Sequence, residues 1–247
     1  MNPRIYHPLP LQAQQIIDLP ESASRHIQVL RLQPGDEVCV FGIANQEWRC
    51  QITQMGRKVV QIQAQDFVVV NLENQREVHL WVGLTANERM DYLIEKATEL
   101  GATSITPIAA DRSVLKLTGD RAEKRLAHWQ GIAIAACEQS GRNTVTTIHA
   151  VQTLKQAIAQ LANYTPEALP HQLILSLSPD GTTLKQLAQS ETKPDQAVIL
   201  LSGPEGGWTS SEEATARQAG FSPISLGPRV LRADTAPLAA LAVLTCE

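Results

Sequence analysis

The sequence predicts an α/β protein preceded by a small β-rich module, and three observations predict this class. Before about residue 72, short apolar runs are separated by turn residues, as in strands joined by tight connections. From Val78 onward, apolar strands alternate with amphipathic helices, which is typical of a parallel sheet covered on both faces. The 247 residues, 43% of them apolar, are enough for one large α/β domain and a small module.

The first module is predicted to contain strands and one short helix. A helix is expected over 24–30, followed by strands over 37–41, 47–52 and 58–64. Pro34-Gly35-Asp36 and Met55-Gly56-Arg57 mark the turns between them. The module carries as many basic as acidic residues, so it is neutral while the rest of the chain is acidic.

The second part begins with a strand over 78–84 and a helix over 87–100. This helix repeats apolar residues at helical spacing, and Gly101 ends it as a residue just past a helix should. A longer helix is expected over 121–139. Further strands are predicted over 103–109, 144–150, 171–177, 196–202 and 222–226, and shorter helices over 153–161 and 182–190.

Composition excludes several classes of protein. The net charge of −4 lacks the basic excess of a typical nucleic-acid-binding protein, so any such surface must be local. No apolar run approaches the roughly 18 residues of a membrane span, and no export signal is visible, so we expect a cytoplasmic protein. The four cysteines lie outside metal-binding spacings; a Cys39–Cys50 disulfide is conceivable, but reduced, buried thiols are the preferred interpretation.

A glycine-rich loop follows the apolar strand that ends at Ser202. Gly203 to Gly207 hold three glycines in five residues, which lets a backbone approach a ligand closely. The loop matches neither phosphate-binding glycine motif, and a tight structural turn is the plain alternative. Two overlapping capping boxes, Thr209 with Glu212 and Ser210 with Glu213, then begin a helix. The loop therefore lies at the carboxyl end of a strand, where open α/β sheets bind ligands.

The next strand ends in a similar way, with the sequence GPRVLRADTAPLAAL. Two successive strand ends with Gly-Pro loops predict one shared crevice. Arg229 and Arg232 stand beside Asp234 there, and surface salt bridging is the alternative interpretation of these arginines. Thr235 begins an alanine-rich final helix that suits close packing.

Four motifs in this order resemble a known family. They are EKATELGATSITPI (95–108), IAIAACEQSGRN (132–143), SGPEGGWTSSEE (202–213) and SLGPRVLRADTA (225–236). Together they resemble the RsmE-type SPOUT methyltransferases, which methylate N3 of a uridine in 16S ribosomal RNA with S-adenosylmethionine. RIYH (4–7) and RHIQVLRLQPGDEV (25–38) resemble that family's PUA-like β-barrel, which binds RNA.

The resemblance implies a domain arrangement and an assembly. Residues 1–72 would form the PUA-like barrel, and 73–247 a SPOUT parallel sheet with a C-terminal trefoil knot. The protein would form a homodimer through the knot and would act on 16S ribosomal RNA within the small (30S) subunit, without a metal and away from membranes.

The resemblance also implies a cofactor site, and the position of charged residues beside it leads to a hypothesis about catalysis. Arg232, with Arg229 as second choice, would stabilise negative charge on the uracil, and Asp234 would act as an acid–base group or orient Arg232. This chain has Asp234 where the family usually has glutamate, which shortens the side chain by one methylene. The residues expected to surround S-adenosylmethionine are Leu201, Gly203, Pro204, Glu205, Gly206, Gly207, Leu226, Gly227, Val230, Leu231 and Arg232.

Candidate RNA contacts are Arg4, Arg25, His26, Arg31 and Arg142, of which Arg31 and Arg142 are preferred. Arginine pairs with phosphate and stacks on exposed bases. Two other functions are weighed. A non-catalytic RNA-binding or ribosome-assembly factor could keep the same fold, and a hydrolase could use Ser202 or Ser210, although no nucleophile-elbow motif supports it.

Overall fold

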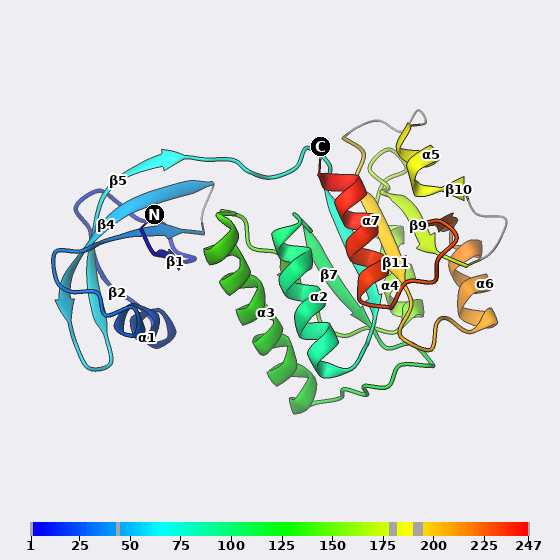
Figure 1. Cartoon of the computed structure of the whole chain (residues 1–247), viewed down its shortest axis with the longest axis horizontal. Coiled ribbons are helices and arrows are strands. Elements are labelled where there is room, and N and C mark those ends of the chain that lie inside the picture. Colours follow the sequence, from blue (N-terminus) through cyan, green and yellow to red (C-terminus); the bar gives the residue numbers. More distant parts are fainter. Residues whose placement is uncertain (1, 43–44, 178–181, 190–194, 247) are drawn as a thin grey trace. The chain divides into compact units, whose positions relative to one another are not determined.

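The computed structural model describes residues 2–42, 45–177, 182–189 and 195–246. The chain divides into two compact units (Figure 1). Unit 1 comprises residues 1–73 and 137–145, and unit 2 comprises residues 74–136 and 146–247. A segment far along the chain is thus grouped with the N-terminal unit, while the domain boundary at residue 72 stays a prediction.

Unit 1 is built on a five-stranded sheet with the order β1-β3-β4-β5-β2. β1 pairs with β3 in parallel, and the other pairs are antiparallel. A single helix, α1 (Glu21–Val29), lies in the N-terminal segment among the described residues. The strands are β1 (Arg4–Tyr6), β2 (Ile16–Asp18), β3 (Glu37–Phe41), β4 (Gln46–Met55) and β5 (Val60–Val69).

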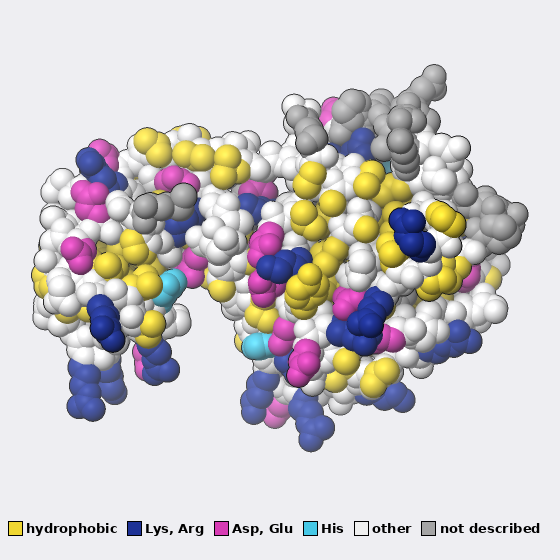
Figure 2. Space-filling view, viewed as in Figure 1, with side chains coloured by type: hydrophobic (Ala, Val, Ile, Leu, Met, Phe, Trp, Pro, Cys, Tyr) yellow, Lys and Arg dark blue, Asp and Glu magenta, His cyan; other side chains and the backbone are white. Residues whose placement is uncertain are grey.

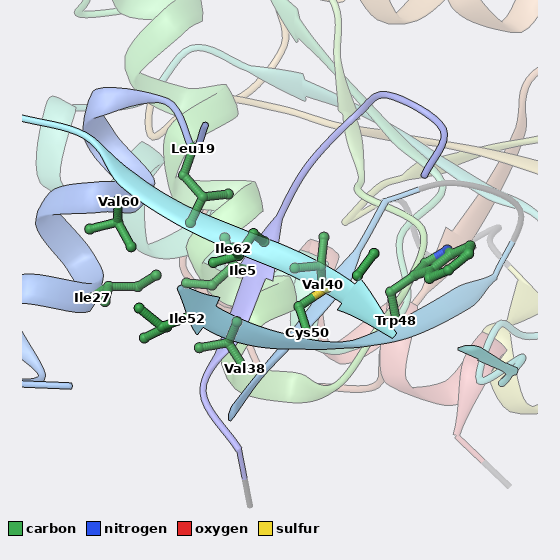
Figure 3. Packing of buried hydrophobic residues seen from close by; sticks show 11 residues of the cluster. Ile5, Leu19, Ile27, Val38, Val40, Trp48, Cys50, Ile52, Val60 and Ile62 are labelled. Atoms are coloured by element: carbon green, nitrogen blue, oxygen red, sulfur yellow. The ribbon is translucent and has the colours of Figure 1, made fainter. Parts of the chain in front are cut away.

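Alternating residues of these strands form the core of unit 1 (Figure 3). Val38 and Val40 of β3 face Ile52 of β4 and Ile62 of β5, and Ile27 of α1 closes the cluster. The period of two follows from strand geometry. One face of each strand therefore determines how unit 1 packs.

Helix α1 begins three residues before the predicted start at Ser24. Pro20 stands at its N-cap position, and proline is well suited to a helix start because its φ is fixed. Ser24 is buried inside the helix, where its hydroxyl donates to Leu19 O at 3.1 Å and accepts from Val60 N at 3.0 Å. Through these two hydrogen bonds, Ser24 connects α1 to β5 and to the segment before the helix.

Unit 2 contains the predicted α/β fold, since its seven strands are all parallel. Their order is β10-β12-β9-β11-β6-β7-β8. The strands are β6 (Val78–Gly83), β7 (Ser104–Ile108), β8 (Thr147–Ile148), β9 (His171–Leu175), β10 (Thr182–Thr183), β11 (Val198–Ser202) and β12 (Ser222–Ser225).

Helices cover both faces of this sheet, as the sequence pattern predicts. α4 and α6 pack on the face that carries Trp81, Ile174 and Leu201, while α2 and α7 contact each other, and α7 contacts β6 and β11 (Figure 1). Trp129 of α3 donates to Asp91 of α2 at 3.0 Å. The helices are α2 (Asn87–Glu99), α3 (Asp120–Ser140), α4 (Leu154–Gln160), α5 (Leu184–Gln189), α6 (Ser210–Gln218) and α7 (Thr235–Thr245), with a 3-10 turn at Leu161–Asn163.

Two predicted elements of unit 2 differ from the structure. The strand predicted over 144–150 is reduced to β8, in which Thr147 and Ile148 pair with Ser104 and Ile105 of β7. The helix predicted over 182–190 begins at Leu184, since Thr182 and Thr183 pair with β12 and Thr183 accepts from Gln186 N as a cap. Its predicted last residue, Ser190, lies outside the described residues.

The four cysteines are free thiols, but the prediction that they are buried is wrong for Cys39, which is half-buried, and for Cys246, which is exposed at the end of α7. Cys50 is fully buried, and this burial raises the pKa of its thiol to about 12. Over the described ranges, none of the helices has the length and apolar character needed to cross a membrane.

Candidate functional site

A cavity opens at the carboxyl edge of the sheet in unit 2, where the neighbouring strands β12, β9 and β11 end. Its volume of about 710 Å³ falls in the range of small-molecule sites, roughly 300–1,000 Å³. The two loops predicted from the sequence both line it. The lining residues are Arg89, Arg112, 175–177, 202–208, Glu213, 224–227, 229–233 and Ala236.

The first loop folds tightly because of its glycines. A Cβ on Gly203 would lie 3.3 Å from Gly207 Cα and from Trp208 N, closer than ordinary contact. Gly207 has a φ of 66°, a conformation that glycine adopts at little cost. Gly207 N also donates to Pro204 O at 2.8 Å. The sequence therefore places main chain, rather than side chains, along this wall of the cavity.

Neighbouring loops fix the outer side of this segment. Glu205 accepts from Ala86 N at 3.0 Å, and Arg89 approaches the same carboxylate oxygen at 3.6 Å. Both partners follow strand β6. The loop after β11 is thereby tied to the loop after the adjacent strand.

The second loop carries the predicted catalytic residues. Arg232 is exposed and lines the cavity, and within the described residues no carboxylate lies within ion-pair distance of it. Its carbonyl accepts from Thr235 N and Ala236 N, which starts α7. Asp234 does not line the cavity; its carboxylate accepts from Thr235 Oγ1 at 3.3 Å.

The cavity brings together ten of the eleven residues expected around the cofactor, and the exception is Leu201. The side chain of Leu201 lies in the apolar cluster beneath α4 and α6. The roles assigned to all these residues, and to Asp234, stay predictions.

Sequence reasoning missed several lining residues, among them Arg89, Arg112, Ser176 and Glu213. Ser176 donates to Glu213 at 3.0 Å, and Arg217 pairs with the same carboxylate. These residues follow strands β6, β7 and β9 or lie on α6. Only the strand order, which the sequence does not reveal, shows that they share one edge.

Two candidate RNA contacts are buried within unit 1. Arg4 pairs with Glu47 at 2.6 Å, donates to Asn143 Oδ1 at 2.8 Å and lies 4.5 Å above the Phe41 ring. Arg142 is 5% exposed and donates to Glu73 from Nε at 3.2 Å. Both guanidinium groups thus have carboxylate partners.

The other three candidates lie at or next to α1. Arg25 and Arg31 are exposed, and Arg25 has only a 3.5 Å contact with Glu21. His26 faces Glu138 at 3.4 Å, and burial raises the pKa of the Glu138 carboxyl. The assignment of all five residues to RNA stays a prediction.

The chain is similar to known RNA methyltransferases over nearly its whole length. The family model described as an RNA methyltransferase domain matches residues 72–245, and the RNA methyltransferase PUA domain matches residues 19–65. The chain is 31% identical to the ribosomal RNA small subunit methyltransferase E of Buchnera aphidicola, over 98% of this chain and 95% of the relative. It is 30% identical to the protein of the same name from Bacillus subtilis, over 96% and 94%.

Solved structures give the same result. The ribosomal RNA small subunit methyltransferase E of Neisseria gonorrhoeae, bound to S-adenosylmethionine, matches with a TM-score of 0.89 and 35% identity, over 98% of this chain and 96% of that one. A methyltransferase of Legionella pneumophila in complex with the same cofactor matches with a TM-score of 0.90 and 33% identity, over 99% and 97%. These matches span both units, and the chain therefore belongs to the RNA methyltransferase family that includes the ribosomal RNA small subunit methyltransferases E.

Proposed function

We propose that this chain transfers the methyl group of S-adenosylmethionine to N3 of a uridine in 16S ribosomal RNA. The observation that carries the proposal is the cavity shared by the Gly203–Gly207 loop and the 226–232 loop at the carboxyl edge of the sheet. Family membership supports an RNA methyltransferase, and the resemblance of the motifs specifies the uridine nitrogen.

The residues of the cavity fit the cofactor. S-adenosylmethionine combines an adenosine, which needs hydrogen-bonding edges and apolar contacts, with an amino acid. Main chain from the glycine loop and the side chains of Leu226, Val230 and Leu231 offer both kinds of contact. The bound sulfonium supplies an already activated methyl group, so the protein mainly has to align donor and acceptor.

Arg232 has a chemical role in this proposal. Uridine N3 must lose its proton before or during attack, which puts negative charge on the uracil oxygens. A guanidinium that bound RNA shields from water would stabilise such charge, and the exposed Arg232 lacks a carboxylate partner in the described part of the chain. Asp234 is proposed either to move the proton or to orient Arg232 when RNA is bound.

The test of this role is the Arg232→Ala variant. Turnover on small-subunit RNA should be abolished, while the dissociation constant for S-adenosylmethionine stays within a few-fold of the wild-type value. A large loss of cofactor affinity would instead assign Arg232 to cofactor binding. Arg229→Ala, at the second cavity-lining arginine, is the matched comparison.

Unit 1 is proposed to bind RNA through exposed cations near α1. Gln28 Nε2 donates to Gly56 O and Arg57 O, which brings the turn between β4 and β5 beside the helix. Arg25, Arg31, Arg57 and Lys58 are all exposed there, and Figure 2 shows dark-blue side chains extending from this part of unit 1. Such a cluster can hold RNA phosphates despite the net charge of −4.

A non-catalytic assembly factor on the same fold is the competing function. The open cavity and the family of named methyltransferases favour the enzyme. Isothermal titration with S-adenosylmethionine separates the two functions, because an assembly factor with a closed site would release no heat. Deleting the gene and mapping methylated uridines in 16S ribosomal RNA then tests the reaction, since one modification should disappear.

The remaining parts of the proposal concern assembly. We infer a C-terminal trefoil knot, a homodimer formed through it, a substrate within the small ribosomal subunit and a cytoplasmic location. The supporting observation is similarity over nearly the whole chain to proteins of this family. Light scattering on the purified protein should give twice the mass of 27.0 kDa.

A further inference from the structure

The loop after β7 carries an arginine that points to an additional role in the site. Residues 110–113 form a closed turn, in which Ala110 N donates to Ser113 Oγ at 3.2 Å and Ser113 N donates to Ala110 O at 3.0 Å. Arg112 lies in this turn and lines the cavity. No cofactor or catalytic motif of the sequence includes it.

Arg112 bonds to two carbonyls of the glycine loop. Its Nη1 donates to Gly206 O at 3.0 Å and to Trp208 O at 3.3 Å. These carbonyls lie on either side of Gly207, whose φ is positive. One guanidinium thus spans the sharpest bend of the loop.

The two peptide groups held by Arg112 are fixed at both ends. The peptide that joins Gly206 to Gly207 donates its N–H to Pro204 O at 2.8 Å. The peptide that joins Trp208 to Thr209 donates its N–H to Glu212 Oε2 at 2.9 Å. Because a peptide unit is planar, bonds at both ends fix its orientation.

Backbone packing gives a second, independent observation. A Cβ on Gly206 would lie 2.9 Å from Arg112 Cβ and 3.4 Å from Arg112 O. The loop therefore rests directly on the stem of Arg112. Next to it, Asp111 N donates to Glu212 Oε1 at 2.9 Å, so the turn also holds the start of α6, which directly follows the glycine loop.

We propose that Arg112 is a positioning residue, which holds the Gly203–Gly207 main chain in the conformation that binds S-adenosylmethionine. The inference rests on the proposed function, because it requires that this loop surrounds the cofactor. Arginine suits the role because the two N–H groups of Nη1 are fixed in the guanidinium plane and can donate to both carbonyls, whereas the N–H groups of a lysine ammonium rotate. Arg112 acts on the loop and leaves the methyl transfer itself to other groups.

The first experiment measures cofactor binding to Arg112→Ala by isothermal titration. Without the two bonds the loop samples other conformations, and a competent fraction of about 1–10% weakens the apparent affinity roughly 10- to 100-fold. Arg112→Lys, which keeps the aliphatic stem and a positive charge but loses the planar guanidinium, should lie between the wild type and the alanine variant. Arg121→Ala is the matched control, because Arg121 is exposed and the structure records no hydrogen bond or ion pair from it to another described residue.

A second readout follows the loop without any ligand. The indole N–H resonance of Trp208, assigned with Trp208→Phe, should shift in Arg112→Ala and stay unchanged in Arg121→Ala. In kinetics, the KM for S-adenosylmethionine should rise in Arg112→Ala while kcat at saturation stays within a few-fold.

The outcomes separate this inference from the proposed function. A wild-type protein that binds no S-adenosylmethionine defeats the proposed function. A wild-type protein that binds it, together with an Arg112→Ala variant of equal affinity and unshifted indole resonance, defeats the role of Arg112 alone. If Arg112→Ala does not fold, Arg112→Lys decides, because affinity equal to that of the wild type overturns the inference.

Discussion

At the scale of single residues, burial decides what an arginine–carboxylate pair contributes to stability. Arg4 and Glu47 lie 2.6 Å apart with side chains 7% and 22% exposed, whereas Arg49 and Asp66 lie 2.9 Å apart with 53% and 65% exposed. Removing Arg4 leaves a partly buried carboxylate without its main cation. Arg4→Ala should therefore lower the free energy of unfolding by about 3–5 kcal/mol, and Arg49→Ala by about 0–1 kcal/mol.

Urea unfolding of both variants measures this difference. Circular dichroism gives the midpoint and slope for each protein, and the two substitutions remove the same side chain from the same sheet. Equal losses of stability in the two variants would contradict a structural role for Arg4.

The burial of Arg4 could not be predicted from the sequence. Its partners Glu47 and Asn143 are 43 and 139 positions away, so no local pattern connects them. The RNA-binding role predicted for Arg4 and Arg142 rested on the chemistry of arginine alone. The Gly203–Gly207 loop was recognisable because its glycines are adjacent in the chain.

A buried histidine makes stability depend on pH. The pKa of His79 is lowered from its ordinary value of 6.5, first by burial and then by the nearby His149, although Glu77 opposes the shift. The unfolded chain therefore takes up a proton at a higher pH than the folded chain. Above about pH 6.5, His79 is neutral in both states and makes its full contribution to the free energy of unfolding. This contribution is lost as the pH falls towards the lowered pKa of the folded state.

The prediction is that wild-type stability falls between pH 7.5 and pH 5.5 and that His79→Asn reduces the fall. Urea midpoints at both values provide the measurement. His171, whose pKa burial also lowers, and Glu138, whose raised pKa acts with the opposite sign, contribute equally to both proteins. The pKa of His149 is lowered by burial as well, and because His149 interacts with His79 its share belongs to the difference that is measured. An identical fall in the two proteins would show that His79 does not contribute.

At the scale of elements, the start of α6 tests which of two overlapping capping boxes forms. Thr209 Oγ1 accepts from Glu212 N at 3.2 Å, and Thr209 N donates to Glu212 Oε2 at 2.9 Å. Glu213 instead pairs with Ser176 and Arg217. Thr209→Ala should cost about 0.5–2 kcal/mol of stability, whereas Ser210→Ala should stay within about 0.5 kcal/mol.

Thermal unfolding of the two variants measures this effect. The Thr209 hydroxyl also donates to Glu212 Oε2 at 2.9 Å, and the same carboxylate accepts from Asp111 N. Thr209→Ala removes this hydroxyl and should therefore weaken binding of S-adenosylmethionine as well. A greater loss of stability in Ser210→Ala would mean that the second capping box is the one that forms.

Elements were predictable where their signals are local. Helix α2 ends at Glu99 with Gly101 at a φ of 92°, as its sequence indicates. The start of α1 was wrong by three residues, since the helix begins at Glu21 directly after Pro20 and includes Ser24 as a buried hydrogen-bonding residue. β10 was assigned to a helix since only its pairing with β12, a distant segment, makes Thr182 and Thr183 a strand.

At the scale of the whole molecule, strand order creates the site. β11, β9 and β12 are neighbours in the sheet, so loops that follow Leu175, Ser202 and Ser225 meet at one edge. The sequence predicted that the last two loops share a crevice, because they follow successive strands. It could not predict the contribution of β9, because pairing between distant strands leaves no local pattern.

The charge distribution of the whole molecule leads to the last prediction. A chain with a net charge of −4 can bind RNA only where cations are concentrated, and Arg25, Arg31 and Arg57 are exposed together near α1. Each phosphate contact to single-stranded RNA contributes about 0.7 to the slope of log K against log salt concentration. Replacing all three with alanine should therefore reduce the slope for 16S ribosomal RNA by about 2.

Filter binding at several salt concentrations measures this slope. The matched variant has alanine at Arg121, Lys124 and Lys155, which are exposed in unit 2. An equal change in both triple variants would mean that binding follows overall charge, and no change in the first would remove this part of unit 1 from the RNA-binding surface.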